Sequence, residues 1–250
     1  MKKLQLTLIQ IDNYGPWTVT PAPRREADLQ SLQADLYSSL QREFGARGGL
    51  VFLMRMDNML AISNGISMAQ HREIMERINS QFPVTVSMGV GKGSTAYEAQ
   101  LEATLALQRE GSSRGRRSVL TGSQVSPPEE DFVQLCHLDL NHSSLLTDTL
   151  PIYDTQLLLQ RAHLHLMERM SRWNSLVFYM GGDNFLALCN GLGEGELLAM
   201  LADIKRELGL EFKGGVGSGR NGETAARLAA EGLHEIRKGK SAGPIVVKRA

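Results

Sequence analysis

Apolar and polar positions along the chain follow two periods, and each period predicts one kind of element. The run KLQLTLIQI, which begins at Lys3, alternates apolar and polar residues and predicts a strand. Residues 24–44 predict a helix that stops at Gly45, because leucines recur there at helical spacing: Leu29, Leu32, Leu36 and Leu40. The runs LVFLM and MLAIS flank a polar corner at Asp57 and Asn58, which indicates a β-hairpin. A helix over 68–79, a strand VTVSMGV and a helix over 95–110 follow.

The second half of the chain predicts the same elements in the same order. FVQLCHLDL predicts its first strand, and Pro151 opens the helix that follows. The runs SLVFYM and FLALCN predict a hairpin, and residues 195–208 predict a helix. The strand LEFKGGV, a helix over 222–238 and a last strand PIVVK complete this half.

The two halves are copies of one unit. Residues 50–66 and 176–192 are identical at ten of seventeen positions with a constant offset of 126, and the same offset carries Gly89-Val90-Gly91 onto Gly215-Val216-Gly217. In the first strands, IQID ending at Asp12 pairs with CHLD ending at Asp139, at an offset of 127. Self-similarity of this kind predicts a tandem arrangement. We assign residues 1–122 and 132–250 to two domains and residues 123–131, with their prolines and acids, to a linker.

The element order predicts an α+β fold. Each copy reads β-α-β-β-α-β, which is the order of a ferredoxin-like (palm-like) domain with its helices on one face of the sheet. In such a sheet the first strand is central and lies beside the hairpin. Acids at the end of that strand and at the hairpin corner would therefore meet at one edge.

Composition narrows the function classes. Lys plus Arg and Asp plus Glu each total 27, so the formal charge is zero and a protein that coats nucleic acid by neutralising its phosphates is excluded. No apolar run approaches the ~20 residues that a membrane-spanning helix needs. The two cysteines, Cys136 and Cys189, lack CxxC spacing, which argues against zinc and for a reducing, cytoplasmic location.

Four aspartates recur at matching places and suggest a metal site: Asp12, Asp57, Asp139 and Asp183. Two carboxylates at close range repel each other unless a cation neutralises them. Oxygen ligands without a histidine or cysteine cluster favour Mg²⁺, which completes its shell with water and substrate phosphates. The alternative for each aspartate is a helix cap or a solvated turn.

The two hairpin corners differ. Gly181 and Gly182 remove side chains beside Asp183 and permit close approach by a phosphate or a base, whereas the first copy has Arg55-Met56 at these places. If each copy carries a site, the two sites are therefore not equivalent. His137, two residues before Asp139 on the same strand face, is a candidate general base, and a packed, hydrogen-bonded histidine is the alternative.

The motifs together resemble a known family. A strand-end Asp followed by GGDNF in a hairpin resembles the GGDEF and class III nucleotidyl cyclase palm domain. More closely, IQIDNYGPWTVTPAPRRE with the later GLVF, DN and NGI, then HLDLN and GGDNF, resembles the archaeal GTP cyclohydrolase III family over almost the whole chain. The resemblance implies Mg²⁺-dependent hydrolysis of GTP to 2-amino-5-formylamino-6-(5-phosphoribosylamino)pyrimidin-4(3H)-one and pyrophosphate, in flavin and deazaflavin synthesis. It also implies two or more Mg²⁺ ions and stimulation by a monovalent cation such as K⁺, without zinc.

The resemblance also assigns residues. It implies metal binding and catalysis by Asp139 and Asp183, and metal binding by Asp12 and Asp57. Candidates for contact with the nucleotide come from both copies: Asn13, Trp17, Arg24, Arg25, Gly181, Gly182, Asn184, Lys238 and Lys240. For most of these the alternatives are turn closure, rim packing or solvated charge. A third basic group, Arg114, Arg116 and Arg117, is predicted to be a solvated loop.

Two other functions use the same residues. A nucleotidyl or diguanylate cyclase would join a 3′-hydroxyl to the α-phosphate, and a GTP-sensing module would keep the acids without turnover. The expected partner in all three is GTP, with no nucleic acid and no membrane, and we expect a homo-oligomer.

Overall fold

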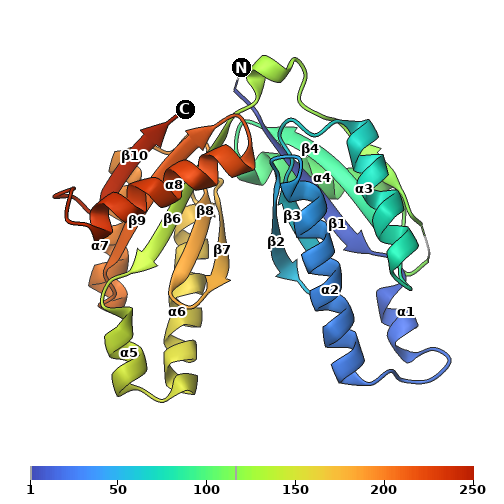
Figure 1. Ribbon diagram of the computed structural model, residues 1–250, viewed down its shortest axis with the longest axis horizontal. Helices are drawn as coiled ribbons and strands as arrows, with labels where there is room; N and C mark the ends of the chain where they lie inside the picture. The colour runs from blue at the N-terminus through green and yellow to red at the C-terminus, as the bar shows by residue number, and fades with distance from the viewer. Residues whose placement is uncertain (1, 116) are drawn as a thin grey trace. The chain divides into compact units, whose positions relative to one another are not determined.

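The computed structural model describes residues 2–115 and 117–250 of the chain, with the backbone alone at residues 144 and 145 (Figure 1). Arg116 of the predicted basic group therefore lies outside the described residues. The described chain forms two compact units, the first mainly from residues 2–131 and the second mainly from residues 132–250. Residues 123–131, assigned above to a linker, pack with the first unit, where the Val125 amide donates to Gln5 Oε1 at 2.7 Å. No helix in the described part of the chain is long and apolar enough to cross a membrane.

The first unit is a mixed five-stranded sheet with helices. Its strand order is β2-β3-β1-β4-β5, in which β1 pairs antiparallel with both β3 and β4, and β5 is parallel to β4. This is the ferredoxin-like order with one added edge strand. The elements are β1 (Leu4–Ile11), α1 (Tyr14–Val19), α2 (Glu26–Gly45), β2 (Leu50–Arg55), β3 (Asn58–Ile62), α3 (Met68–Gln81), β4 (Val86–Gly93), α4 (Ala96–Arg109), β5 (Leu120–Gly122) and the 3₁₀ turn η1 (Pro128–Glu130).

The second unit repeats this topology. Its strand order is β7-β8-β6-β9-β10, with β6 central and β10 parallel to β9. The α+β prediction of two tandem ferredoxin-like units is confirmed. The elements are β6 (Val133–Leu140), α5 (Ser143–Thr149), α6 (Ile152–Ser171), β7 (Leu176–Gly181), β8 (Asn184–Leu188), α7 (Glu194–Leu208), β9 (Phe212–Gly219), α8 (Gly222–Arg237) and β10 (Ile245–Arg249).

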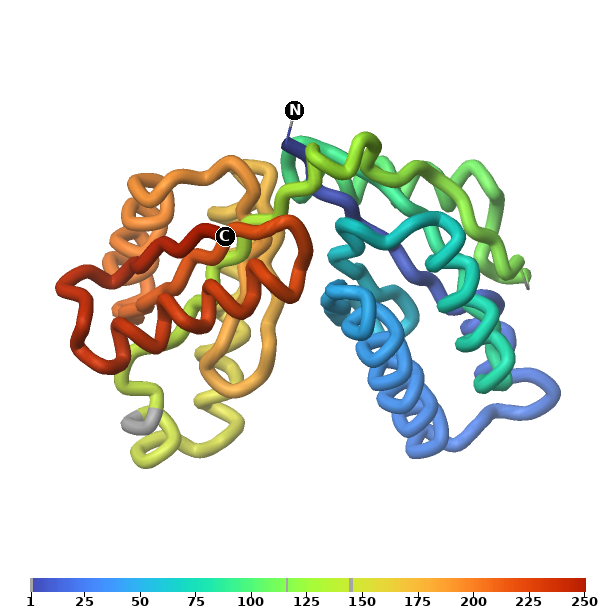
Figure 2. The backbone as a smooth tube through the Cα atoms, turned by 45° about the horizontal axis from the view of Figure 1, so that its top comes forward, coloured from blue at the N-terminus to red at the C-terminus, as the bar shows by residue number. Residues whose placement is uncertain are grey.

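Helices cover both faces of each sheet, so the expectation of helices on one face is wrong. In the first unit α2 and α3 lie side by side (Figure 2). Their buried leucines and isoleucines pack against one face of the sheet. Helix α4 packs on the other face, where β4 carries Gly89 and Gly91. A Cβ atom at Gly91 would lie 2.3 Å from the Ala103 nitrogen, so only glycine permits this approach. The G-x-G runs therefore serve helix packing, and the same holds for Gly215 and Gly217 against α8.

The register of the central strands corrects the sequence alignment of the two copies. Gln10 on β1 pairs with Asn58, and Asp139 on β6 pairs with Asn184. Because Asn58 and Asn184 are 126 positions apart, Asp139 corresponds to Gln10 and not to Asp12. The first strands are thus offset by 129, so the pairing of Asp12 with Asp139 is wrong.

Asn141 is the structural counterpart of Asp12. The Asp12 amide donates to the Thr85 carbonyl at 2.8 Å, and the Asn141 amide donates to the Glu211 carbonyl, 126 positions further on, at 2.7 Å. The following residues, Asn13 and His142, both adopt the left-handed conformation and precede short helices, α1 and α5. A shift of two residues leaves the same side chains on the same face of the sheet. The alternation of apolar and polar residues along the strand therefore cannot reveal such a shift.

A buried polar cluster distinguishes the first unit's core. The Thr7 hydroxyl lies 2.7 Å from His71 Nε2 and 2.8 Å from the Ser63 hydroxyl, while His71 Nδ1 lies 2.8 Å from the Ser67 carbonyl. Burial lowers the pKa of His71 to about 4. The second unit has apolar or weakly polar side chains at the equivalent positions: Cys136, Cys189 and Leu197.

We predict that this cluster makes the first unit sensitive to acid. The unfolded His71 binds a proton below pH 6.5 while the folded one resists protonation down to about pH 4, so stability falls as pH drops through that window, by about 3 kcal/mol when complete. The triple variant T7C/S63C/H71L, which copies the second unit, should lose most of this dependence. Urea unfolding followed by Trp17 fluorescence in a Trp173→Phe background measures it. An unchanged pH slope in the triple variant would contradict the assignment to His71.

Candidate active-site corners in the two units

Each unit brings its strand end and its hairpin turn together at one corner of the sheet. In the first unit the Ile11 amide donates to the Asp57 carbonyl at 3.0 Å, and in the second the Leu140 amide donates to the Asp183 carbonyl at 3.3 Å. We call the surroundings of Asp12 and Asp57 the first corner. The second corner is that of Asp139, Asn141 and Asp183.

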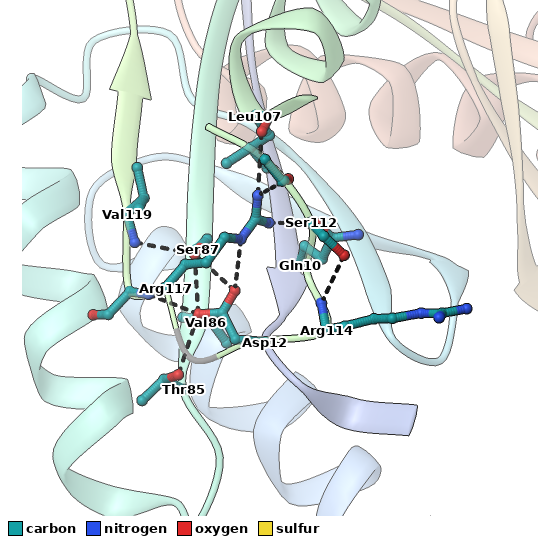
Figure 3. Close-up of polar contacts among 12 residues, drawn as sticks. Gln10, Asp12, Thr85, Val86, Ser87, Leu107, Ser112, Arg114, Arg117 and Val119 are labelled. Carbon is teal, nitrogen blue, oxygen red and sulfur yellow. Dashed lines mark hydrogen bonds and ion pairs between the residues drawn. The ribbon is translucent and has the colours of Figure 1, made fainter. Parts of the chain in front are cut away.

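The Asp12 carboxylate is enclosed by hydrogen-bond donors (Figure 3). The Ser87 hydroxyl lies 2.8 and 3.0 Å from its two oxygens, and the Thr85 hydroxyl lies 3.1 Å from Oδ2. The Ser118 amide donates to Oδ2 at 2.8 Å, and Arg117 Nε lies 3.4 Å from Oδ1. Only 1% of Asp12 is exposed, so these donors stabilise a buried charge.

Arg117 is anchored, so the expectation of a solvated loop is wrong for this residue. Its side chain is 9% exposed. It donates to Gln10 Oε1 at 2.7 Å and to the carbonyls of Leu107 and Gly111, at 3.2 and 2.7 Å, at the end of α4 (Figure 3). Arg114, by contrast, is exposed. Arg117 therefore fixes the first corner to the helix, a role that sequence spacing did not indicate.

The other first-corner acid is more open. Asp57 lies in the turn between β2 and β3 and forms an ion pair with Arg55 at 3.2 Å. The Arg55 side chain is 76% exposed, and a pair of this kind contributes little to stability. The Asp57 side chain is 28% exposed, so it is partly open to solvent, unlike Asp12.

The second corner is dominated by cations. Asp139 Oδ1 accepts from Arg237 at 2.6 Å, and its Oδ2 lies 2.7 Å from Lys213 Nζ. Lys213 also donates to Asn141 Oδ1 at 3.0 Å. Burial raises the pKa of Asp139, but its bonds to Arg237 and Lys213 more than offset this, so that the pKa lies below its ordinary value. Asp139 is therefore ionised and paired.

The hairpin turn of the second unit borders a cavity. Gly181 and Gly182 have φ of 95° and 58°, in the region that favours glycine. Asp183 accepts from the Asn184 side chain at 2.8 Å. Gly182 and Asp183 also line a cavity of 360 Å³ whose other walls are Ser143, Leu146, Thr147, Ile152, Thr155, Gln156, Leu159 and Tyr179.

His137 lies on the same face as Asp139 and contacts the hairpin. Its Nε2 lies 3.1 Å from Asn184 Oδ1. Burial lowers its pKa, so the imidazole is neutral at pH 7. An amide oxygen only accepts, so Nε2 carries the proton in this arrangement and Nδ1 the lone pair.

Three of the predicted nucleotide contacts in the first unit line one cavity. Trp17, Arg24 and Arg25 border a space of 560 Å³. The Arg24 guanidinium lies 3.9 Å from the centre of the Trp17 ring and donates to the Trp17 carbonyl at 3.0 Å. Arg25 is exposed and pairs with Asp28 through both carboxylate oxygens, at 2.7 and 2.8 Å. Asn13 is the left-handed residue that opens α1.

Lys238 and Lys240 follow the end of α8 and are exposed. The residue before them, Arg237 at the end of α8, contacts Asp139 of the second corner. Lys213 has no signal in the sequence beyond its place as a lysine within the strand run LEFKGGV.

A family model for GTP cyclohydrolase III matches residues 4–250. The chain belongs to the GTP cyclohydrolase III family. Curated family members include proteins named GTP cyclohydrolase III from Methanobrevibacter smithii, 48% identical over 94% of both chains, and from Methanothermobacter thermautotrophicus, 47% identical over 94% of this chain and 95% of that one. The family member from Methanocaldococcus jannaschii is 46% identical over 94% of this chain and 88% of its own.

Solved structures similar to this family member include GGDEF domains. The GGDEF domain of DgcB from Caulobacter crescentus, in complex with c-di-GMP, is 13% identical over 62% of this chain and 93% of that one, with a TM-score of 0.42. A second structure of that protein, with its coiled coil, has a TM-score of 0.41 over 49% of this chain and 71% of that one, at 14% identity. At scores this low the fold of the present chain rests on its own strand order.

The two corners of this GTP cyclohydrolase III family member differ in their fitness for Mg²⁺. Among residues 2–115 and 117–250, no group of three or more His, Cys, Asp or Glu side chains gathers. Mg²⁺ needs only one or two carboxylates when phosphates and water complete its shell. The first corner offers Asp12 and Asp57, which have one arginine partner each, Arg117 at 3.4 Å and Arg55 at 3.2 Å, and the other donors to Asp12 are neutral. The second corner already holds Lys213 and Arg237 on its strand acid, so a divalent ion there meets two positive charges.

We predict that Arg117 stabilises the first unit. Replacing it by methionine removes a charged donor from the enclosed Asp12 and four contacts in all, and should lower the free energy of unfolding by about 2–3 kcal/mol. Arg114→Met, at an exposed neighbouring position, is the matched control and should change it by less than about 0.5 kcal/mol. Urea unfolding reported by Trp17 measures both. Equal effects of the two substitutions would show that Arg117 is not an anchor.

Proposed function

We propose that the chain is a GTP cyclohydrolase that hydrolyses GTP to 2-amino-5-formylamino-6-(5-phosphoribosylamino)pyrimidin-4(3H)-one and pyrophosphate, and thereby supplies flavin and deazaflavin synthesis. The observation that carries the proposal is the match of residues 4–250 to this family, with relatives at 46–48% identity over 94% of the chain. Opening of the imidazole ring at C8 and cleavage between the α- and β-phosphates are both hydrolyses. Both therefore need water to be held and activated beside the bound nucleotide.

We assign the Mg²⁺ dependence to the first corner. Asp12 and Asp57 would hold the metal, whose chemistry is to neutralise the triphosphate and to activate water at neutral pH. The Ser87 and Thr85 hydroxyls keep the Asp12 carboxylate oriented, since a carboxylate has about four lone-pair sites and the hydroxyls need not leave. A metal ion bound to Asp12 would displace the longest of its contacts, the one from Arg117 Nε to Asp12 Oδ1. This assignment of the metal site reverses the prediction from the sequence, which favoured Asp139 and Asp183 as metal ligands and catalytic residues.

The remaining residues bind the nucleotide. Arg24 and Arg25 border the same cavity as Trp17 and would meet the triphosphate, for which the guanidinium fork is suited. Asn13, at the start of α1, would contact the base edge. In the second unit a nucleotide would bind without metal. It would contact the open turn at Gly181 and Gly182, the Asn184 side chain, and two exposed lysines, Lys238 and Lys240.

Two further expectations belong to this proposal. His137 is the candidate general base of the second unit, through its Nδ1 lone pair, with Asp139 and Asp183 beside it. Stimulation by K⁺ and assembly into a homo-oligomer accompany the activity.

The decisive assay incubates the full chain with GTP and Mg²⁺ and follows ultraviolet absorbance, pyrophosphate and products. Loss of the purine chromophore with release of pyrophosphate is the expected result. A cyclic or dinucleotide product would identify a cyclase, and unchanged GTP would identify a sensor, and either would overturn the proposal.

We predict that matched substitutions in the two hairpin turns act differently. Asp57→Asn removes a proposed metal ligand and should lower kcat/KM at least about 100-fold, with a higher Mg²⁺ concentration for half-maximal rate. Asp183→Asn, at the equivalent position 126 residues later, should leave that Mg²⁺ concentration unchanged. Rate measurements across a Mg²⁺ titration separate them. A shifted Mg²⁺ requirement in Asp183→Asn alone would place the metal in the second unit.

Metal removal provides a further prediction. EDTA should stop turnover, and Mg²⁺ alone should restore it, because the candidate ligands are oxygens. Product formation after dialysis and readdition of each ion is the measurement. Restoration by Zn²⁺ only would contradict the choice of a hard cation.

A further inference from the structure

The two corners differ at three equivalent positions that lie around one point of the sheet. Each pair occupies the same place in its unit, as the register of the central strand and the 126-residue offset of β4 and β9 show: Gln10 and Asp139, Asp12 and Asn141, Ser87 and Lys213. Going from the first unit to the second, the acid moves two residues back along the strand, an amide replaces it at the strand end, and a lysine replaces the serine. The three positions sum to one negative charge in the first unit and to zero in the second.

Lys213 reaches the oxygens that a metal ion would otherwise take. It lies directly opposite Asp139 in the pairing of β6 with β9. Its Nζ is 2.7 Å from Asp139 Oδ2 and 3.0 Å from Asn141 Oδ1, and its side chain is 18% exposed. A compact ammonium between a carboxylate and an amide oxygen, shielded from water, has the ligand types of a hard cation.

We propose that the Lys213 ammonium takes the place of the divalent cation in the second unit, so that this corner is formed permanently and independently of metal. The proposal rests on the proposed function in that it takes the first corner as the place where the metal binds. Ser87, at the equivalent position, donates one neutral hydroxyl to Asp12, whose cationic partner in the first unit is Arg117 at the longer distance of 3.4 Å.

Arg237 supports the same assignment. It donates to Asp139 from the end of α8 at 2.6 and 3.3 Å, so Asp139 has two cationic partners and no unmet charge. A divalent ion would have to displace Lys213 or remain beside both cations, and repulsion disfavours each. The second unit therefore keeps its shape when the metal of the first unit is absent or exchanged.

The test counts Mn²⁺ ions bound to the full chain by electron paramagnetic resonance. Wild type should bind Mn²⁺, Asp12→Asn should lose it, and Lys213→Arg in wild type should change nothing. The triple substitution D139Q/N141D/K213S, made in the Asp12→Asn background, copies the first corner into the second and should restore Mn²⁺ binding. Circular dichroism and the urea midpoint verify folding of each variant.

Two results would overturn the proposal. One is Mn²⁺ binding that survives Asp12→Asn and disappears in Asp139→Asn, and the other is a folded triple variant that binds no Mn²⁺. If the triple variant does not fold, Ser87→Lys decides instead: loss of Mn²⁺ from the first corner supports the proposal, and retention overturns it. Absence of Mn²⁺ from wild type would refute the metal assignment of the proposed function, while Mn²⁺ in the triple variant would still support the role of Lys213.

Discussion

The geometry of both corners depends on one backbone hydrogen bond, in which the amide near the end of the central strand donates to the carbonyl of the hairpin-turn aspartate. The bond joins Ile11 to Asp57 in the first unit and Leu140 to Asp183 in the second. It places two acids from distant parts of the sequence at one edge of the sheet. The central strand is held from its other side by β4 or β9, which carry Ser87 and Lys213 to the same edge. The chemistry of each corner then follows from which side chain stands at each of these fixed places.

This arrangement of strands and helices could be predicted from the sequence, because the spacing of apolar residues and the internal repeat can both be read directly along the chain. The hairpins, the long helices and the order of elements follow from apolar spacing and from the 126-residue offset. The short helices α1 and α5 were not predicted, because each has only about two turns and follows a residue in the left-handed conformation. The coverage of both faces of the sheet was not predicted either, because the reason for Gly89 and Gly91 becomes apparent only when α4 is seen to pack against them.

The site was less predictable than the frame. Matching acid to acid paired Asp12 with Asp139, and only the strand register shows that Asn141 is the true counterpart. The partners of these acids are also long-range: Arg117 is 105 positions from Asp12, and Arg237 is 98 from Asp139. No sequence pattern reports such contacts. The duplicated chain has kept one frame while exchanging side chains at its corners. Each corner pairs acids with cations, Arg55 and Arg117 in the first and Lys213 and Arg237 in the second, which is consistent with a formal net charge of zero.

We propose that the first unit carries the metal-dependent hydrolysis of GTP through Asp12. The most direct measurement is product analysis of the Asp12→Asn chain with GTP and Mg²⁺, with its folding verified by the urea midpoint. We expect that neither pyrophosphate nor the ring-opened product forms at more than about 1% of the wild-type rate. Formation of both products at the wild-type rate by the folded variant would contradict it.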